Sequence, residues 1–577
     1  SSKLYGVNVV QFKLDRTSGI EGSSMAEGEP LSAEEAELKS AIEAVLNSPS
    51  RKKLVIAGPG TGKTTLFKQM LELAIGEPDR RIVLTFINNL KDDLEDDLAG
   101  LAEVFTLHSY CLGLLHREAA LRVSLSPNFR CCPGLASLIA QDWELIEESE
   151  APQFVGEMRN LAEENHIPFY LARGEYYDAV DFDDTVYRVY EGLSSGRAAP
   201  DSYDLVLIDE YQDFNSLEAG FIDVLGENNP IMIAGDDDQA LYSQLRDASW
   251  DHIRLLRRAG EYEVFELPFC MRCPKVVVDA VSDVLTRSRQ LHRLEGRIEK
   301  QYKHFPPVKG ADSAKYPKIA HVETSVQRQD ANYMGRYIAQ AIAEITLDEI
   351  EAAAHGGYPA ALVIVAKPYR DQIISHLEGE GYVVDTKRES GSKLDRQVGL
   401  SILKEDRDSN LGWRIILGVD TPSFLADAIV ETADGTKRLA DVLPSEYHEG
   451  VLAEVDAYEP TQEVPEGDRE TPTATDAPSV RVTSFEGAKG LSAQHVFIAG
   501  LHDGELPHDP AAIKDLEICK FVVGLTRTRK KCTLIRTRNF AGNWKSPSSF
   551  ISWIDDARLD FIKIDAEYWK IQERIKC

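Results

Sequence analysis

The sequence lacks the features of a membrane protein or of a secreted one. No uncharged apolar run approaches the roughly 18 residues that a spanning helix needs. The chain does not open with a charged stretch followed by an apolar one, as a secretory signal does. Its 8 cysteines are scattered through 577 residues, which is unlike a disulfide framework. We therefore expect an intracellular protein with reduced thiols and no membrane partner.

One pair of cysteines, Cys270 and Cys273 in "CMRC", has the spacing of metal ligands. No second CxxC or CxxH follows, and a structural zinc site usually takes four ligands. Reduced thiols are the favoured interpretation here, and a metal site is the alternative.

Positive charge is also scarce. The chain has 64 Lys and Arg against 95 Asp and Glu, a formal net charge of -31. This balance argues against a surface coated for non-specific DNA binding. It leaves room for a local groove that holds one strand.

Short β-branched runs bounded by turn residues are abundant, and amphipathic stretches such as 64–74 and 90–101 lie between them. This alternation predicts parallel sheets covered by helices. The runs form two clusters, before about residue 265 and after about residue 360, which indicates two α/β cores. They read "KKLVIAG", "RIVLTF", "YDLVLIDE", "PIMIAGD", "AALVIVAK", "HVFIAGL" and "KCTLIRT".

Two inserts interrupt these cores. The first is rich in helix formers, and the second ends in an acidic stretch with Pro and Thr and no apolar periodicity, which is typical of a flexible segment. We expect a leader or flexible tail at 1–24, a first core at 25–115 and 196–265 with its insert at 116–195, and a second core at 266–384 and 479–577 with its insert at 385–478.

A phosphate-binding loop is predicted at "AGPGTGKT", between a strand-like run and a helix-like one. The glycines let backbone N–H groups turn toward a phosphate. Lys63 would contact the β- and γ-phosphates, and the Thr64 hydroxyl would bind Mg²⁺. The predicted nucleotide contacts here are Ala57, Gly58, Pro59, Gly60, Thr61, Gly62, Lys63, Thr64 and Thr65.

A hydrolytic site also needs carboxylates, and "LVLIDEYQD" places two at the end of an apolar strand. Asp209 is the predicted Mg²⁺ ligand, and Glu210 the predicted general base. An acidic cluster at a helix start is the alternative, and the phosphate loop upstream makes it the weaker one.

Further motifs follow in order from about Leu31 to Ile535. With "IDEYQD", this ordered set resembles the superfamily 1 DNA helicases of the UvrD/Rep/PcrA type. The segments are "VLTFINNLKDDLEDDL" (83–98), "VFTLHSYCLGLL" (104–115), "DFDDTVY" (181–187), "IAGDDDQALYSQLRDAS" (233–249), "LPFCMRCP" (267–274), "SFEGAKGLSAQHVFIAGL" (484–501) and "FVVGLTRTRKKCTLI" (521–535).

The resemblance implies an α/β fold with two RecA-like parallel-sheet P-loop NTPase cores, each with an inserted, mainly helical subdomain. It implies a DNA-dependent ATPase that uses ATP and Mg²⁺ to move 3′ to 5′ along single-stranded DNA and to unwind duplex. The expected partners are single-stranded DNA or junctions of single- and double-stranded DNA. The expected location is cytoplasmic, on the nucleoid, or nuclear, depending on the organism.

The resemblance also assigns roles to single residues. Arg272 and Arg527 would reach the γ-phosphate from the second core, and Gln239 would sense it. The alternative for each arginine is a surface ion pair. For the DNA strand, Phe86 and Tyr242 would stack on bases, with core packing as the alternative. Asn88, Thr106, His108 and Arg246 would contact backbone or bases, with a structural histidine as the alternative for His108.

Four positions depart from the family pattern. Glu35 and Met271 stand where the family has a Gln and an aromatic that read adenine, so ATP is implied mainly by the family. Ser492 stands where an acidic residue often follows "KGL", the segment whose Gly490 we count among the nucleotide contacts. The segment "SQLRDA" is one residue longer than usual and lacks a stacking aromatic.

Two other functions stay open at this point. The small second insert and the acidic composition also fit a motor subunit that works with a nuclease or repair partner. The missing aromatics fit a nucleotide-switched clamp that binds nucleic acid without moving. No nuclease-like acidic motif is evident after Ile535, so the expectation is a chain that carries the motor alone.

Overall fold

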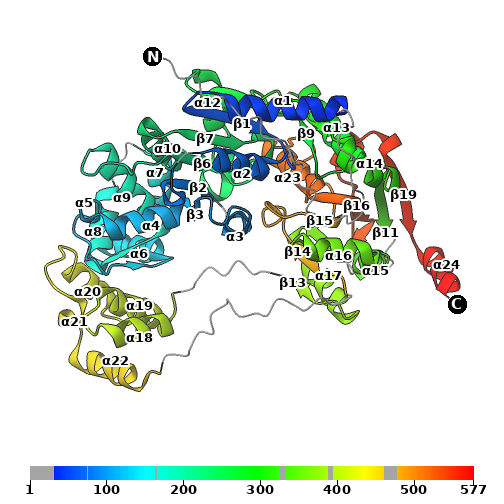
Figure 1. Ribbon diagram of the computed structural model, residues 1–577. Coiled ribbons are helices and arrows are strands. Elements are labelled where there is room, and N and C mark those ends of the chain that lie inside the picture. Colours follow the sequence, from blue (N-terminus) through cyan, green and yellow to red (C-terminus); the bar gives the residue numbers. More distant parts are fainter. Residues whose placement is uncertain are drawn as a thin grey trace, which may run out of the picture.

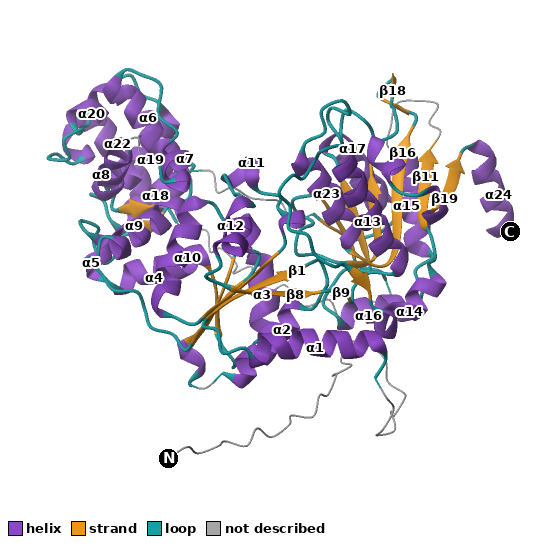
Figure 2. Ribbon diagram, turned by 90° about the horizontal axis from the view of Figure 1, so that it is seen from above, coloured by secondary structure: helices purple, strands orange, loops and turns teal. Residues whose placement is uncertain are grey.

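The computed structural model describes residues 31–576 except 75, 87, 163–165, 325–331, 387–393 and 460–476. Two separate parallel sheets dominate it (Figure 1, Figure 2). The first sheet has the order β3-β2-β6-β7-β1-β8, and all its neighbours are parallel. Its strands are β1 (Lys52–Ala57), β2 (Arg81–Thr85), β3 (Glu103–Thr106), β6 (Leu205–Ile208), β7 (Ile231–Gly235) and β8 (Glu263–Leu267).

The second sheet has the order β13-β14-β12-β15-β16-β11-β19 and is parallel throughout. Its strands are β11 (Ile319–Thr324), β12 (Ala361–Val365), β13 (Val384–Asp385), β14 (Val480–Thr483), β15 (Ala493–Ala499), β16 (Thr528–Thr537) and β19 (Leu559–Ile564). Short two-stranded pairs complete the set: β4 (Arg130–Cys131) with β5 (Ala179–Val180), β9 (Phe269–Cys270) with β10 (Lys303–His304), and β17 (Asn539–Phe540) with β18 (Asn543–Trp544).

Helices flank the first sheet and build its insert. Around the sheet lie α1 (Ala33–Asn47), α2 (Lys63–Leu73), α3 (Asn88–Asp97), α4 (Leu107–Arg117), α10 (Ser216–Asn228), α11 (Ser243–Arg246) and α12 (Asp251–Ala259). Between β3 and β6 stand α5 (Ala119–Arg122), α6 (Leu135–Glu147), α7 (Phe154–Asn160), α8 (Ile167–Tyr177) and α9 (Phe182–Ser194).

The second core has α13 (Lys275–Gln290), α14 (Pro306–Lys315), α15 (Asn332–Ala343), α16 (Leu347–His355), α17 (Lys367–Gly379), α23 (Asp515–Thr526) and α24 (Ala566–Lys576). Its insert consists of α18 (Arg396–Glu405), α19 (Asn410–Asp420), α20 (Leu425–Glu431), α21 (Leu439–Val442) and α22 (Ser445–Ala457). This second insert lies against α6 and α8 of the first insert, and away from β13 and β14 of its own core (Figure 1).

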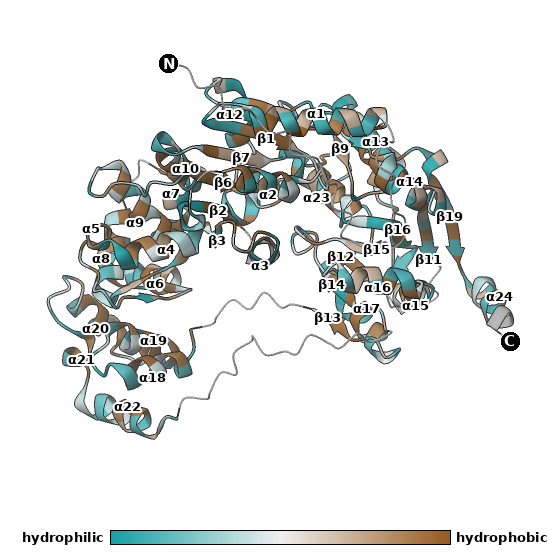
Figure 3. Ribbon diagram, in the orientation of Figure 1, coloured by the Kyte–Doolittle hydropathy of each residue, from teal (hydrophilic) through white to brown (hydrophobic). Residues whose placement is uncertain are grey.

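Burial explains why these segments became strands. Every residue of β2, β6 and β7 is buried, and the ribbon of the first sheet is coloured largely for hydrophobic residues (Figure 3). A fully buried aliphatic side chain contributes about 1.5–3 kcal/mol. Strands covered on both faces read as continuous apolar runs, and those runs were visible in the sequence.

The prediction of two parallel α/β cores, each with a helical insert, is confirmed. The acidic end of the second insert lies outside the described residues, as does the predicted tail at 1–24. In the described ranges, no helix is long and apolar enough to cross a bilayer.

Candidate nucleotide site and polynucleotide surface

The phosphate loop joins β1 to α2 at the edge of the first core. Gly60 and Gly62 adopt left-handed backbone angles, with φ of 69° and 90°. A Cβ atom on Gly60 would lie 2.4 Å from the Cβ of Arg272, so the close approach of residues 269–273 requires a glycine there. The hydroxyl of Thr61 donates to the carbonyl of Gly58 at 2.9 Å and closes the turn.

A second segment covers this loop. The backbone N–H of Met271 donates to the carbonyl of Gly60 at 2.8 Å, and the Met271 side chain reaches Gly62. The Tyr302 hydroxyl donates to the carbonyl of Pro59 at 3.0 Å. The predicted base-reading position Met271 therefore lies directly on the loop. The sequence offered no signal for Tyr302, because it lies in no recognisable motif.

The side chain of Lys63, at the end of the loop, contacts two carboxylates that follow β6. Lys63 Nζ lies 3.5 Å from Asp209 and closer still to Glu210, to which it donates a hydrogen bond. Burial alone would raise the pKa of Glu210, but the ammonium groups of Lys63 and Lys489 hold it well below its usual range. Burial raises the pKa of Asp209, and the adjacent Glu210 charge adds to that rise. Glu210 is therefore held ionised.

Backbone geometry and a neighbouring amide fix Glu210. Its backbone φ angle is 53°. Residues other than glycine seldom adopt such an angle, and those that do are found mostly at constrained sites. Gln212 Nε2 donates to Glu210 at 2.5 Å, and Gln212 Oε1 accepts from the N–H of Asp236 at 2.9 Å. The base candidate is thus tied to the end of β7, which leads into the segment that carries Gln239.

Lys489 joins the two cores. Its ammonium donates to the carbonyl of Gln239 at 2.6 Å, lies 3.7 Å from Glu210, and forms a buried ion pair with Asp213. Burial raises the pKa of Asp213 to about 6 despite this pairing. Lys489 precedes the predicted contact Gly490 within "GAKGL", so its motif was found while its role was missed.

Three arginines lie close to one another without acidic partners: Arg272 against the loop, Arg527 beside Gln239, and Arg529 over the Tyr358 ring. In the described part of the chain, no carboxylate lies within ion-pair distance of Arg272, Arg527 or Arg529. Arg527 donates to Gln239 Oε1 at 3.2 Å, and Arg272 donates to the carbonyl of Thr526 at 3.4 Å. Burial, with repulsion from Arg272, lowers the pKa of both Arg527 and Arg529 to about 10. Arg527 is buried and Arg272 is partly buried, and cations without a carboxylate partner at such a site fit a polyphosphate.

Two acidic sites are candidates for binding a metal ion: Asp209, and the cluster of Asp236, Asp237 and Asp238. Their surroundings differ. Asp209 lies 3.5 Å from Lys63 at the end of the loop and suits Mg²⁺ bound to a phosphate. The carboxylates of Asp236, Asp237 and Asp238 also converge. However, Lys300 Nζ lies 2.5 Å from Asp236 and 2.6 Å from Asp238, so a cation already neutralises that cluster.

Four of the residues predicted to contact a DNA strand lie close together in the first core. The Phe86 and Tyr242 rings lie 5.4 Å apart, and the Arg246 guanidinium stacks 4.1 Å from the Phe86 ring centre. Arg246 lies 3.2 Å from His108 Nε2 and donates to Glu218 at 2.9 Å. Burial, with the nearby charge of Arg246, lowers the pKa of His108 to about 3 and keeps the ring neutral. Phe86 is buried at 8% exposure, while Tyr242 is only partly buried.

The remaining predicted residues have local contacts. Thr106 caps α4, accepting from the N–H of Ser109 at 3.2 Å. Glu35 forms a capping box with Ser32 at the start of α1, so its carboxylate is engaged by the backbone. The Asn88 side chain lies outside the described part of the structure, although α3 begins at that residue.

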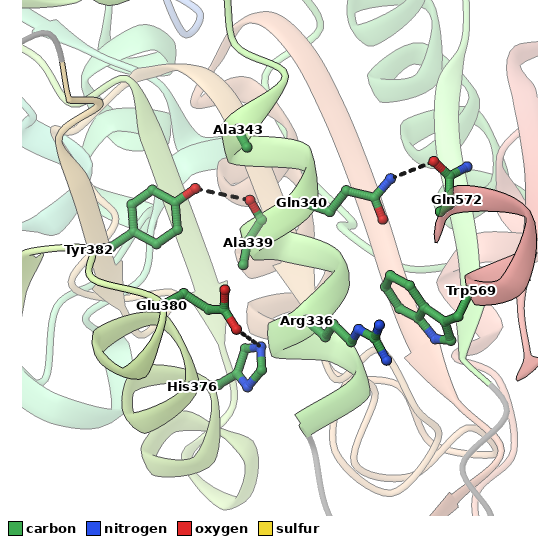
Figure 4. Close-up of a pocket in the computed structure, with 9 residues that line it drawn as sticks. All are labelled: Arg336, Ala339, Gln340, Ala343, His376, Glu380, Tyr382, Trp569 and Gln572. Atoms are coloured by element: carbon green, nitrogen blue, oxygen red, sulfur yellow. Dashed lines mark hydrogen bonds and ion pairs between the residues drawn. The ribbon is translucent and has the colours of Figure 1, made fainter. Parts of the chain in front are cut away.

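A separate pocket lies far from the loop. It has a cavity volume of about 280 Å³ between α15, α17 and α24, and polar groups such as Gln340 and His376 line it (Figure 4). Arg336 stacks on Trp569 there, 3.9 Å from the ring centre. None of the predicted site residues reaches this pocket, so it is not part of the nucleotide site.

Comparisons with known proteins point to the same residues. The AAA domain family matches residues 39–244, which include the phosphate loop, Asp209, Glu210 and Gln239. A probable DNA helicase II homolog of Mycoplasma capricolum is 28% identical over 35% of this chain and 34% of its own length. The ATP-dependent DNA helicase UvrD1 of Mycobacterium leprae is 26% identical over 33% of this chain and 32% of its own length.

Over about a third of its length, this chain is similar to UvrD- and PcrA-type DNA helicases. The ATP-dependent DNA helicase PcrA of Bacillus subtilis is a further relative, 25% identical over 33% of this chain and 31% of its own length. The predicted resemblance to superfamily 1 helicases of the UvrD/Rep/PcrA type is confirmed. The match spans about a third of the length of these relatives. Among solved structures, Saccharomyces cerevisiae Dbp5 bound to RNA and ADP BeF3 covers 93% of this chain and 92% of its own, at 9% identity and a TM-score of 0.37.

Proposed function

We propose that this UvrD-like chain hydrolyses ATP with Mg²⁺ and uses the energy to move 3′ to 5′ along single-stranded DNA and to unwind duplex. The observation that carries the proposal is the composite site. Lys63 and Glu210 come from the first core, Arg272 and Arg527 come from the second, and all of them face one phosphate loop. The polarity rests on the family resemblance.

The chain's own residues account for the hydrolytic step. The loop N–H groups and Lys63 would hold the phosphates, and Glu210 would accept a proton from the attacking water. Arg272 and Arg527 would stabilise charge that grows on the transferred phosphoryl group. Mg²⁺ bound by Thr64, Asp209 and phosphate oxygens would neutralise part of the triphosphate charge.

A chain of contacts also connects the nucleotide site to Tyr242, one of the residues proposed to stack on DNA bases. Gln239 accepts from Arg527 through its side chain and from Lys489 through its backbone. Three residues further on, Tyr242 donates to the carbonyl of Glu486 in the second core at 3.3 Å and lies beside Phe86. A change in the position of Arg527 on hydrolysis would therefore move the segment that bears the proposed stacking residues.

The direct test is ATP hydrolysis with and without single-stranded DNA. We expect stimulation by DNA, loss of turnover in Lys63→Ala, and nucleotide binding without turnover in Glu210→Gln. Lys68→Ala is the matched control, because Lys68 lies on the same helix with an exposed side chain, and it should keep full turnover. If DNA failed to raise hydrolysis by the unaltered protein, the proposal would be wrong.

A further inference from the structure

The cysteine pair in "CMRC" occupies a position that the proposed function does not explain. Cys270 ends β9, and Cys273 lies just before α13, which begins at Lys275. Both side chains are fully buried. Between them stand Met271 and Arg272, the two residues that lie on the phosphate loop. A conformational change in this turn would therefore move residues that contact the phosphate loop.

Cys270 and Cys273 are neighbours in one turn, and their side chains share a hydrogen bond. The Cys270 sulfur accepts from the backbone N–H of Cys273 at 3.3 Å, and that nitrogen is one bond from the Cys273 Cα. Disulfides join residues whose Cα atoms are about 4.4–6.8 Å apart. Cys270 and Cys273 thus need rotation of side chains within one turn, and no movement of a separate element.

The surroundings give the two sulfurs different reactivity. Burial alone would raise the pKa of Cys270, but hydrogen bonds from Cys273 lower it to about 6. Burial, with the neighbouring Cys270 sulfur, raises the pKa of Cys273 well above its usual range. These surroundings favour a thiolate at Cys270 and a protonated thiol at Cys273.

We propose that Cys270 and Cys273 form a reversible disulfide with peroxide as oxidant, and that this bond lowers nucleotide binding at the adjacent loop. In this step the Cys270 thiolate attacks one peroxide oxygen, the O–O bond breaks, and hydroxide leaves to become water. Cys273 then attacks the sulfenic sulfur, the S–O bond breaks, and a second water forms. Two thiols and one peroxide give one disulfide and two waters, and a thiol reductant reverses the change.

The consequence for nucleotide follows from the contacts of the turn. A disulfide shortens the path between Cys270 and Cys273, and it shifts the Met271 N–H that donates to Gly60 and the Arg272 side chain beside it. A shift of the Arg272 guanidinium would weaken a charge-assisted hydrogen bond to a bound phosphate. This part of the inference rests on the proposed nucleotide site.

The test combines peptide mapping with binding of a fluorescent ATP analogue. After peroxide treatment we expect a peptide joined through Cys270 and Cys273, a loss of analogue affinity of about 10–100-fold, and recovery with dithiothreitol. Cys273→Ser should keep its own affinity after peroxide. Cys131→Ser, which removes an exposed cysteine outside the turn, should remain as sensitive as the unaltered protein.

Two results would overturn the proposal. One is a peptide map without the Cys270–Cys273 bond after complete peroxide titration. The other is a mapped bond that leaves analogue affinity unchanged. Both readouts are independent of hydrolysis, so a protein without DNA-stimulated turnover would contradict the proposed function and leave this test intact.

Discussion

At the scale of single residues, Lys489 carries more of the inter-core contact than its motif suggests. Its ammonium is almost fully buried, pairs with Asp213 and approaches Glu210, and it also donates to the carbonyl of Gln239. Removing one partner of a buried pair leaves an uncompensated charge, which costs about 3–5 kcal/mol. Exposed pairs contribute about 0–1 kcal/mol.

We therefore predict that Lys489→Ala lowers the free energy of unfolding by about 3–5 kcal/mol. Lys520→Ala is the control. Lys520 lies on α23 and pairs with Glu486 at 2.6 Å, with both side chains partly exposed. Its loss should cost about 1 kcal/mol or less. Calorimetry of both variants checks this, and equal shifts would contradict the buried-bridge account.

His108 predicts a pH dependence of stability. The folded-state pKa is about 3, below the ordinary value of 6.5, because the ring is buried against Arg246, with Arg159 and Asp183 nearby. The unfolded chain binds a proton between these values and the folded chain does not. The contribution of His108 is therefore complete above pH 6.5 and falls by up to about 1.4 kcal/mol per pH unit as pH drops.

The variant His108→Gln should flatten the decline in melting temperature between pH 6.5 and pH 5. His355→Gln, at an exposed position on α16, should leave the decline unchanged. Thermal unfolding across this range is the measurement. An unchanged slope in His108→Gln would mean that the ring is protonated in the folded protein.

Local sequence patterns were enough to select residues that lie together in the fold, while their roles stay predictions. Lys63, Asp209 and Glu210 were predicted from local patterns, and the structure brings them together. Sequence reasoning missed Tyr302 and the role of Lys489, because their significance arises from contacts across more than 200 positions of the chain. No local pattern encodes such contacts.

At the scale of elements, a buried charge cluster holds the two inserts together. Asp142 on α6 accepts from Arg173 Nε of α8 at 2.9 Å and from Arg414 Nε of α19 at 2.7 Å. All three side chains are buried. The first insert thus supplies Asp142 and Arg173, and the second insert contributes Arg414. The second insert is therefore attached to the first core, although the chain enters it from the second.

We predict that Asp142→Asn loosens this attachment, because two buried guanidinium groups lose their carboxylate. Amide exchange should accelerate in α18–α22 and in α6, with α2 unchanged. Arg438→Ala is the control, since Arg438 is exposed and pairs with Asp408 and Asp441 inside the second insert. Exchange at the parental rate in α19 of Asp142→Asn would contradict the account.

Two of the β-strands, β8 and β19, were not predicted from the sequence. The strands β8, "EVFEL", and β19, "LDFIKI", have charged residues among their apolar ones and therefore lack a continuous apolar run. Both strands lie at sheet edges, where one side is open to solvent. Continuous burial gave β1, β2, β6 and β7 their apolar runs, whereas partial exposure left β8 and β19 without one.

At the scale of the whole molecule, the contacts between the cores converge on the phosphate loop. Arg272 lies against Gly60, Arg527 donates to Gln239, and Lys489 pairs with Asp213. A triphosphate bound there would compensate the arginines and draw the cores together, and its hydrolysis would release them. The surface around Phe86 and Tyr242 lies on the same path, which is why we connect turnover to movement.

Displacement of streptavidin from biotinylated single-stranded DNA tests this central claim most directly. A protein that moves 3′ to 5′ should clear streptavidin from a 5′-biotinylated strand with ATP, and it should leave a 3′-biotinylated strand occupied. Glu210→Gln should clear neither. Hydrolysis stimulated by DNA without any displacement, or displacement from the 3′ end alone, would contradict the account.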